Sequence, residues 1–263
     1  MNAPSAVEFL SPRAAANDAV PARQLVSKPL PFSVRIVRNE DQLQRAVYIR
    51  AEAYNRHWPH LTPYLRVPEA QDRDPNSLIF LAQRKEDGEA LGTMRIDTNL
   101  FGDLPITADP NVPEWIKAKP LAYVTRLGVK QGASGSLVKL LMFKALCRYC
   151  IAKQVSWILV AVRPPADRDY ERLGFSDLVE DGKLIPHESA WGMPLRWMAF
   201  EIIASERRWK ESNHPLYKFM FEDYHPDIEI FSSVSGMWSR PRLDIPALTG
   251  DAPMFDALGL PLI

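Results

Sequence analysis

The stretch from Ala122 to Phe175 constrains the fold of this 263-residue chain more than any other part of the sequence. Residues 122–129 are rich in β-branched and aromatic side chains and form a run short enough for a strand. After a turn of small residues at 131–136, apolar side chains recur at helical spacing. A second apolar run, residues 156–162, is typical of a fully buried strand. The order strand, helix, strand predicts an α/β fold.

The turn between the first strand and the helix is suited to a phosphate. Ser134 or Ser136 is placed to cap the helix. The first turn of a helix presents unpaired backbone N–H groups and the positive end of the helix dipole. A phosphate-bearing ligand is therefore expected at this N-terminus.

A short helix follows from Pro164 to Gly174, and the whole order of elements resembles the GNAT acyltransferase fold. In that fold the turn holds the pyrophosphate of coenzyme A or the phosphopantetheine of a carrier protein. The resemblance therefore implies a thioester as co-substrate and no permanently bound cofactor. A backbone N–H near Leu127 or Gly128 would stabilise the oxyanion. The resemblance implies that the donor is bound by Leu127, Gly128, Val129, Gly132, Ser134, Gly135 and Ser136.

Tyr170 lies four residues before Gly174, where the GNAT fold places a tyrosine that protonates the departing thiolate. A phenol is suitable because its ordinary pKa of about 10 keeps it protonated at neutral pH. The alternative is a tyrosine that only packs at the end of a helix.

The phosphate turn departs from the usual Arg/Gln-x-x-Gly-x-Gly/Ala pattern. Residues 131–136 are shorter and contain no arginine, whereas the several phosphates of coenzyme A favour more positive charge. The departure favours the phosphopantetheine arm of an acyl carrier protein as donor and leaves acyl-coenzyme A as the alternative.

The N-terminal half is similar to the acyl-homoserine-lactone synthases and the related N-acyl amino acid synthases. The resemblance extends from about Val34 to Phe175. It rests on the order of short elements, which here are Arg50 with Tyr54, Asp72 and Asp74, Gly92-Thr-Met-Arg95, and Thr125-Arg126. It implies that Arg50, Tyr54, Arg95, Tyr123 and Thr125 lie around the amine substrate.

Tyr123 stands where the lactone synthases usually carry a glutamate, three residues before Arg126. The departure favours N-acylation of an amino acid or another small amine over lactone formation. An acyl-homoserine-lactone synthase, an ordinary acetyl- or acyl-coenzyme A-dependent GNAT and a non-catalytic acyl-binding domain remain the alternatives. The resemblance also implies a cytoplasmic bacterial enzyme.

The charged residues have two interpretations each. Asp72 or Asp74 can collect the ammonium of the acceptor and take its proton, or both can belong to a solvated loop with internal Asp–Arg pairs. Arg95 and Arg126 can hold the acidic loop or a substrate carboxylate, because a guanidinium matches a carboxylate in a two-bond fork. A purely structural ion pair is the alternative for both arginines.

Composition excludes several classes of function. Lys and Arg together number 32, as do Asp and Glu, which argues against general nucleic-acid binding. No apolar run approaches the roughly 20 residues that cross a bilayer. The five histidines lack ligand spacing, so no metal is implied, and Cys147 and Cys150 are expected to pack in the core.

Three regions are expected along the chain: a flexible leader over residues 1–31, a GNAT-like domain over 32–203 with a mixed central sheet flanked by helices, and a helical C-terminal extension over 204–263 packed on the same domain. The stretch before a last strand at 195–202 is expected to be irregular. An acyl chain could occupy a tunnel, or the same residues could form the core; these are Phe80, Met94, Trp157 and Trp197. A basic helix face for an acidic carrier protein, or simply a solvated face, would comprise Lys139, Lys144, Arg148 and Lys153.

Overall fold

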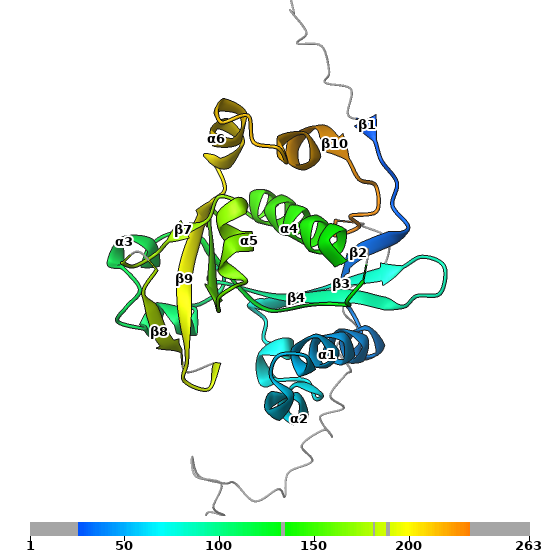
Figure 1. Cartoon of the computed structure of the whole chain (residues 1–263), viewed down its shortest axis with the longest axis horizontal. Helices are drawn as coiled ribbons and strands as arrows, with labels where there is room; N and C mark the ends of the chain where they lie inside the picture. Colours follow the sequence, from blue (N-terminus) through cyan, green and yellow to red (C-terminus); the bar gives the residue numbers. More distant parts are fainter. Residues whose placement is uncertain (1–25, 133–134, 181, 188–189, 232–263) are drawn as a thin grey trace, which may run out of the picture.

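A computed structural model describes residues 26–132, 135–180, 182–187 and 190–231 (Figure 1). Its main sheet has eight strands in the order β2-β3-β4-β5-β6-β9-β7, with β8 also paired to β9. The pairing of β5 with β6 is parallel, and the other pairings described in this sheet are antiparallel. The strands are β2 Phe32–Ile36, β3 Ser77–Arg84, β4 Ala90–Thr98, β5 Leu121–Val129, β6 Trp157–Val162, β7 Ser176–Asp177, β8 Leu184–His187 and β9 Met193–Glu201. The predicted mixed α/β sheet is confirmed.

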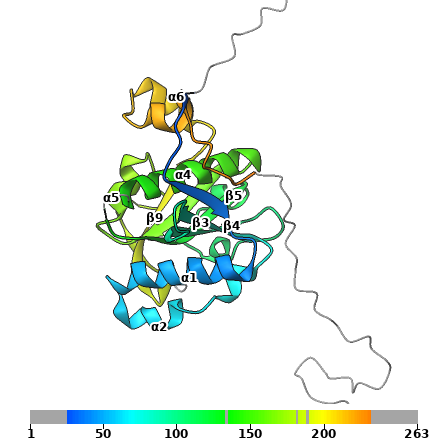
Figure 2. The same ribbon diagram turned by 90° about the vertical axis from the view of Figure 1, so that its right-hand side faces the viewer.

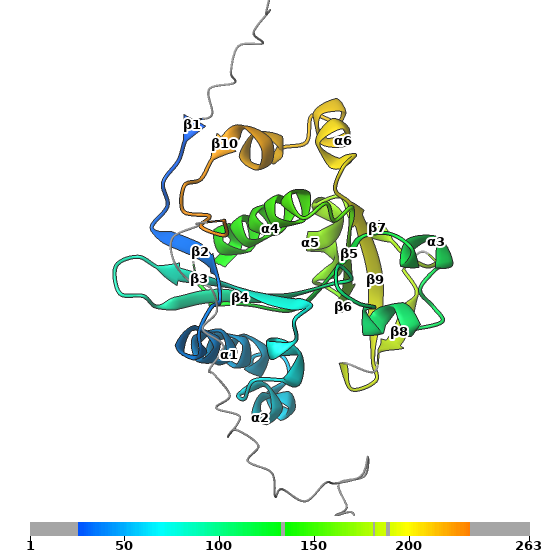
Figure 3. The same ribbon diagram turned by 180° about the vertical axis from the view of Figure 1, so that it is seen from behind.

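Helices cover both faces of the sheet. Helices α1 (Glu40–Asn55) and α2 (Thr62–Leu65) lie on one face, and α4 (Gly135–Ala152) and α5 (Asp167–Arg172) on the other (Figures 1 and 2). The short helix α3 (Glu114–Lys117) lies near β8 at one end of the sheet (Figure 3). Single 3-10 turns occur at Pro59–Leu61, Ala70–Arg73 and Pro105–Ala108. No helix in the described part of the chain has the length and apolarity needed to cross a bilayer.

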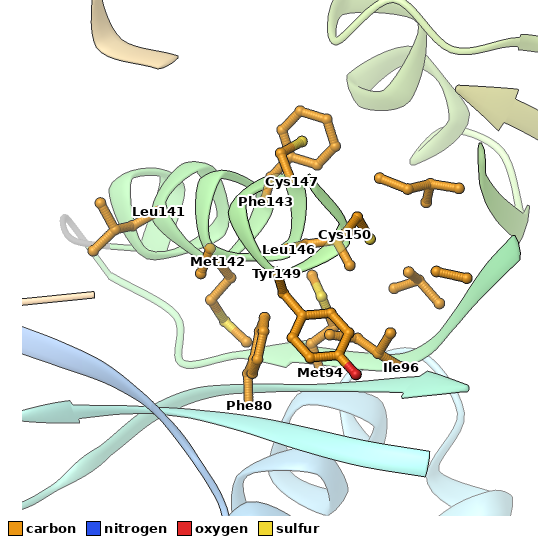
Figure 4. Close-up of a cluster of buried hydrophobic side chains, with 14 of the residues drawn as sticks. Phe80, Met94, Ile96, Leu141, Met142, Phe143, Leu146, Cys147, Tyr149 and Cys150 are labelled. Atoms are coloured by element: carbon orange, nitrogen blue, oxygen red, sulfur yellow. The ribbon is translucent and has the colours of Figure 1, made fainter. Parts of the chain in front are cut away.

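The core between α4 and the sheet is apolar. Phe80, Met94 and Ile96 project from the strands toward α4, and the ring of Phe80 meets that of Tyr149 edge-on at 6.2 Å (Figure 4). Cys147 and Cys150 are free and buried, as predicted, and burial raises the pKa of both thiols. This face of the sheet stabilises the fold by burial of apolar area.

A second apolar core separates the four residues considered for a tunnel. Trp197 is buried, and Trp157 half-buried, in a cluster with Leu121 and Ile116, whereas Phe80 and Met94 belong to the core under α4. The idea that these four side chains line one tunnel is therefore wrong. Packing accounts for them instead.

The C-terminal segment covers the outer side of α4. It contains α6 (Ser205–Glu211), a π-helical turn at Lys218–Glu222 and β10 (Asp223–Tyr224), which pairs in parallel with β1 (Val26–Ser27). Ile228 forms a bridge with Val34 beside the edge strand β2, which shields that edge. The last residues of the expected leader therefore contact the extension: Val26 and Ser27 pair with β10, and the Leu30 N–H donates to Asp227 at 2.6 Å.

Two expectations for this half of the chain are corrected. Lys144 is buried, because its Nζ donates to the carbonyl oxygen of Asp223 at 2.6 Å and to that of Phe219, and lies 3.1 Å from Nδ1 of His225. The predicted basic face of α4 is therefore partly covered. The stretch expected to be irregular before the last strand contains β7 and β8, which the sequence analysis missed because both strands are short.

Candidate active site

The two parallel strands separate beside the predicted donor site. Their ladder runs from Leu121 with Trp157 to Val124 with Val160, while β5 continues to Val129 along β4. None of the described strands pairs with residues 125–129 on the side where β6 has left. This is an unpaired strand edge, with backbone groups able to bind a substrate.

A bulge in β5 redirects Arg126. Thr93 is opposite Gly128, yet Arg95 is opposite Thr125, so Arg126 and Leu127 together face Met94. Arg126 has φ of +54°, a left-handed conformation that is uncommon for a residue other than glycine. Regular alternation would direct Arg126 toward α4 with Val124. The bulge instead turns it to the α1 face, where it shares an ion-pair partner with Arg95.

Three arginines and two carboxylates form one buried cluster on that face. Arg50 makes a two-bond fork with Asp72, at 3.0 and 2.9 Å. Arg126 makes a second fork with Glu69, at 2.7 and 2.6 Å. Arg95 lies between them and donates to Glu69 at 3.1 Å and to Asp72 at 3.2 Å. We call these five residues the arginine cluster.

The arginines keep both carboxylates of the cluster ionised. Burial alone would raise the pKa of Glu69, but hydrogen bonds and charge from Arg126, with Arg95 and Arg50, hold it below its usual range. Burial likewise opposes ionisation of Asp72, and Arg50 more than compensates, so that pKa is also lowered. Carboxylates held in this way are weak proton acceptors.

The structure separates the two aspartates that the sequence grouped together. Asp72 joins the cluster, where its carboxylate also accepts the backbone N–H of Glu69 at 2.8 Å. Asp74 is exposed and accepts the N–H of Asn76 at 2.7 Å, as in an Asx turn. Glu69, which the sequence analysis missed, takes the second acidic position. Glu69 and Asp72 form a capping box at the start of the 3-10 turn. The three-residue spacing of these two acidic residues is the sequence signal that could have identified Glu69.

The other predicted acceptor residues lie around the arginine cluster. Thr125 Oγ1 accepts a hydrogen bond from Arg95 Nε at 3.1 Å. Tyr54, at the end of α1, is half-buried, which raises its pKa, and the nearby charges of Arg126 and Arg50 oppose that rise. The guanidinium of Arg126 also lies 5.5 Å from the ring centre of Trp191.

Tyr123 is buried and pairs with a residue that the sequence analysis missed. Its hydroxyl lies 3.0 Å from Nε2 of His187 on β8, and the two rings are stacked with centres 6.1 Å apart. His187 was passed over because it has no ligand spacing in the sequence. Only the fold brings β8 to this side of β5.

Tyr170 lies on α5, on the other side of the opened strand edge. Its ring packs edge-on against Phe175 at 5.2 Å. Burial raises the pKa of its hydroxyl, and the nearby Tyr54 adds to the effect. A phenol in this setting keeps its proton at neutral pH.

A basic side chain from the end of helix α1 lies beside the phosphate turn. Helix α4 begins at Gly135, between the two serines predicted to cap it, and Gly132 has φ of +136°. Arg56 from the end of α1 donates to the carbonyl oxygen of Val129 at 2.9 Å, so an arginine does lie beside the turn. A depression of about 160 Å³ here is lined by Arg84, Leu91, Lys130, Gln131, Gly132, Gly135 and Val138.

Of the remaining predicted donor residues, Leu127, Gly128 and Val129 lie on the opened part of β5, and Ser136 is exposed in the first turn of α4. Ser134 lies outside the described residues. Within the described residues no group of three or more His, Cys, Asp and Glu side chains is arranged to hold a metal ion.

Solved structures share this architecture. FeeM, an N-acyl amino acid synthase from uncultured soil microbes, is 17% identical and aligns over 72% of this chain and 97% of its own, with a TM-score of 0.55. BjaI, a coenzyme A-dependent acyl-homoserine lactone synthase, is 15% identical and aligns over 74% of this chain and 93% of its own, with a TM-score of 0.50. The fold is that of the GNAT-like acyltransferases.

The sequence narrows that class to one family. The model of the N-acyl amino acid synthase FeeM family matches residues 41–201, which include the arginine cluster, the opened strand and Tyr170. The chain belongs to this family and is an acyltransferase. No curated protein matches the sequence significantly.

Proposed function

We propose that the protein transfers an acyl group from the phosphopantetheine thioester of an acyl carrier protein to the amine of an amino acid or a similar small molecule. The observation that carries this proposal is the separation of β5 from β6 after Val124. The opened edge lies beside the phosphate turn, with Tyr170 on the α5 side and the arginine cluster on the α1 side. Donor and acceptor therefore have separate approaches to one strand edge.

In this proposal the thioester arm lies along residues 127–129 and its phosphate lies at the turn that includes Gly132, Gly135 and Ser136. A backbone N–H at Leu127 or Gly128 stabilises the tetrahedral oxyanion. The amine nitrogen bonds to the carbonyl carbon, the C–S bond breaks, and Tyr170 gives its proton to the leaving thiolate. The Tyr170 phenol is protonated at neutral pH and therefore has a proton to give.

The acceptor lies against the α1 face, near Tyr54, Tyr123 and Thr125. Arg50, Arg95 and Arg126 hold Glu69 and Asp72 in ion pairs, and this supports a positioning role for all three. These ion pairs hold the acceptor side of the site rigid. A rigid site favours reaction because it orients the amine nitrogen toward the carbonyl carbon.

One observation favours the second candidate donor, acyl-coenzyme A. The guanidinium of Arg56 lies beside the phosphate turn and can serve the additional phosphates of coenzyme A, which the carrier arm lacks. Arg56→Ala therefore distinguishes the donors, with exposed Arg66→Ala as the matched control. The carrier proposal predicts that Arg56→Ala changes the kcat/KM for acyl carrier protein less than about twofold. A tenfold loss confined to acyl-coenzyme A, together with equal wild-type kcat/KM values for the two donors, would contradict the carrier preference.

The reaction itself is tested by product analysis. The protein is incubated with long-chain acyl carrier protein or acyl-coenzyme A and a panel of amino acids and small amines, and N-acyl products are sought by mass spectrometry. A lactone product would select the acyl-homoserine-lactone alternative. Absence of any acyl product across the panel would support a domain that binds an acyl group without transferring it. We place the enzyme in the cytoplasm, where both donors are made.

A further inference from the structure

We propose that Tyr123 and His187 form a proton relay that removes the proton from the acceptor amine as it attacks the thioester. This inference rests on the proposed N-acylation. It assigns Tyr123 as the catalytic group that meets the amine and His187 as the residue that acts through it.

The two side chains are already in contact. The Tyr123 hydroxyl lies 3.0 Å from His187 Nε2, the rings are nearly parallel at 8°, and both residues are buried. The ring of Trp197 lies 5.3 Å from that of His187 and supports it from β9. A buried pair at hydrogen-bond distance, with its rings held by packing, is pre-organised for proton transfer.

The pair is located where the acceptor is expected. Tyr123 lies one residue before the end of the β5–β6 ladder at Val124. It lies on the same face of the sheet as Arg95 and Thr125, because alternate residues of a strand share a face. The Tyr123 hydroxyl is also close enough to Arg126 to influence the pKa of that guanidinium. The relay therefore borders the arginine cluster.

The carboxylates of this region are poorly suited to the task. Glu69 and Asp72 are each engaged by arginines, and the pKa of each is lowered. Asp74 is exposed. Asp97 is the cross-strand neighbour of Tyr123, and burial raises its pKa. However, its carboxylate accepts a hydrogen bond from Ser77 and lies 3.6 Å from Arg95.

The step balances as follows. The amine nitrogen forms its bond to the carbonyl carbon, and the N–H proton, which becomes acidic on bond formation, passes to Tyr123 Oη. The Tyr123 hydroxyl proton passes at the same time to His187 Nε2, which requires the proton of the neutral imidazole to lie on Nδ1. The C–S bond breaks and the thiolate takes the proton of Tyr170. Exchange with solvent then removes a proton from His187 and returns one to Tyr170.

Two charged groups lie beside the pair. Asp97 on β4 is the cross-strand neighbour of Tyr123, and Arg126 on β5 is close enough to Tyr123 for the two to interact electrostatically. Because only neutral His187 can accept the proton, the relay predicts that the titration of one enzyme group adds to the fall in kcat/KM that protonation of the free amine causes on acidification.

The test uses Tyr123→Phe, His187→Gln and the double variant, with Tyr149→Phe as a control that removes another buried phenol hydroxyl. The measured quantity is kcat/KM for the amine as a function of pH, with saturating donor. Each single variant is expected to lower kcat/KM about 100-fold near neutral pH and to lose the acid limb that His187 adds to protonation of the free amine. The deficit narrows at low pH, where His187 of the wild type is protonated and can no longer accept the proton. The KM for the donor stays unchanged, the double variant is no slower than the slower single variant, and Tyr149→Phe behaves as wild type.

Several results would overturn the relay. One is a variant that keeps the acid limb of the wild type, and another is a double variant whose losses multiply. A third is loss of the acid limb in Asp97→Asn alone, which would make Asp97 the proton acceptor. If His187→Gln fails to fold, the pH profile of Tyr123→Phe decides alone. Absence of amide product with the wild type overturns the proposed function itself, whereas normal product with unchanged variant profiles overturns only the relay.

Discussion

The two faces of the central sheet differ in what they bury, although the same strands supply both. Along β4, Met94 and Ile96 enter the apolar core under α4, while Arg95 joins the arginine cluster on the α1 face. The α4 face is held by apolar packing, whereas the α1 face, which we call the charged face, adds the paired charges of the arginine cluster to its apolar packing. The comparison teaches that period-two alternation lets a single strand carry a core and a site together.

The charged face is also the one that departs from regular geometry. The bulge and the left-handed Arg126 occur there, and β5 leaves β6 just before them. Strained backbone persists where its surroundings over-determine it. In this molecule the Glu69 fork holds Arg126 in place.

The largest effect on stability is expected from breaking the charged face. Asp72→Ala removes the fork partner of the buried Arg50, which keeps only its 3.3 Å ion pair with Glu69. The loss is therefore expected toward the lower end of the about 3–5 kcal/mol that breaking a buried ion pair costs. Asp74→Ala, two residues away and exposed, is the matched control and is expected to change stability by less than about 1 kcal/mol. Urea unfolding measures both. Equal losses in the two variants would contradict the distinction between these aspartates.

A smaller loss of stability is expected from replacing the two glycines at which helices α1 and α4 approach the sheet closely. A Cβ at Gly128 would lie 3.0 Å from Ala53 Cβ and 3.2 Å from Arg50 Cα, so α1 must shift. A Cβ at Gly92 would lie 2.9 Å from Val138 Cγ1 on α4. Both Gly→Ala variants are expected to lose about 1–3 kcal/mol.

These two variants differ in their effect on activity. Only Gly128→Ala displaces Arg50, so only this variant is expected to lower kcat/KM for the amine, by about tenfold or more. Steady-state kinetics on the folded variants measures the difference. A similar kinetic loss in Gly92→Ala would show that the α4 face also sets the acceptor site.

The smallest effects are expected in the pH dependence of stability, on the order of 1.4 kcal/mol per unit of pKa difference. The pKa values of Glu69 and Asp72 are lowered in the folded state, so the unfolded chain binds more protons and stability falls as the pH drops below about 4. The raised pKa of Asp97 opposes part of this loss.

Lys144 determines how stability depends on pH in the alkaline range. Burial, with the charge of Arg148, lowers its pKa to about 8. Between that value and its unfolded pKa of about 10.4 the unfolded chain again binds more protons, so stability rises with pH. Glu69→Gln is expected to flatten only the acid arm and Lys144→Met only the alkaline arm. Urea unfolding over a pH series measures both, and a Lys144→Met profile that still rises at alkaline pH would contradict this origin.

Local pattern predicted the fold better than the site. Residues 122–129 are rich in β-branched and aromatic side chains, and the apolar residues of α4 recur at helical spacing. The burial of Cys147 and Cys150 followed from their place in that apolar helix. The order of the main strands and helices followed from the same signals. Of the two interpretations of Arg95 and Arg126, contact with the acidic loop holds for Arg95 with Asp72, while Arg126 pairs with Glu69.

Long-range contacts account for what the sequence analysis missed. Glu69 meets Arg126 across 57 residues, and Tyr123 meets His187 across 64. Arg56 reaches Val129 from another helix, across 73 residues. Lys144 is buried by a segment 79 residues further along the chain. No local periodicity encodes such pairs, because each depends on how separate elements pack.

The central claim is that acyl transfer to an amine occurs at the opened edge of β5, with Tyr170 protonating the leaving thiolate. The most direct measurement is the rate of N-acyl product formation, followed by mass spectrometry, for wild type, Tyr170→Phe and the control Tyr149→Phe. The account predicts a loss of about 100-fold or more for Tyr170→Phe, with unchanged thermal stability and a normal rate for the control. A Tyr170→Phe rate within a few-fold of wild type would contradict it.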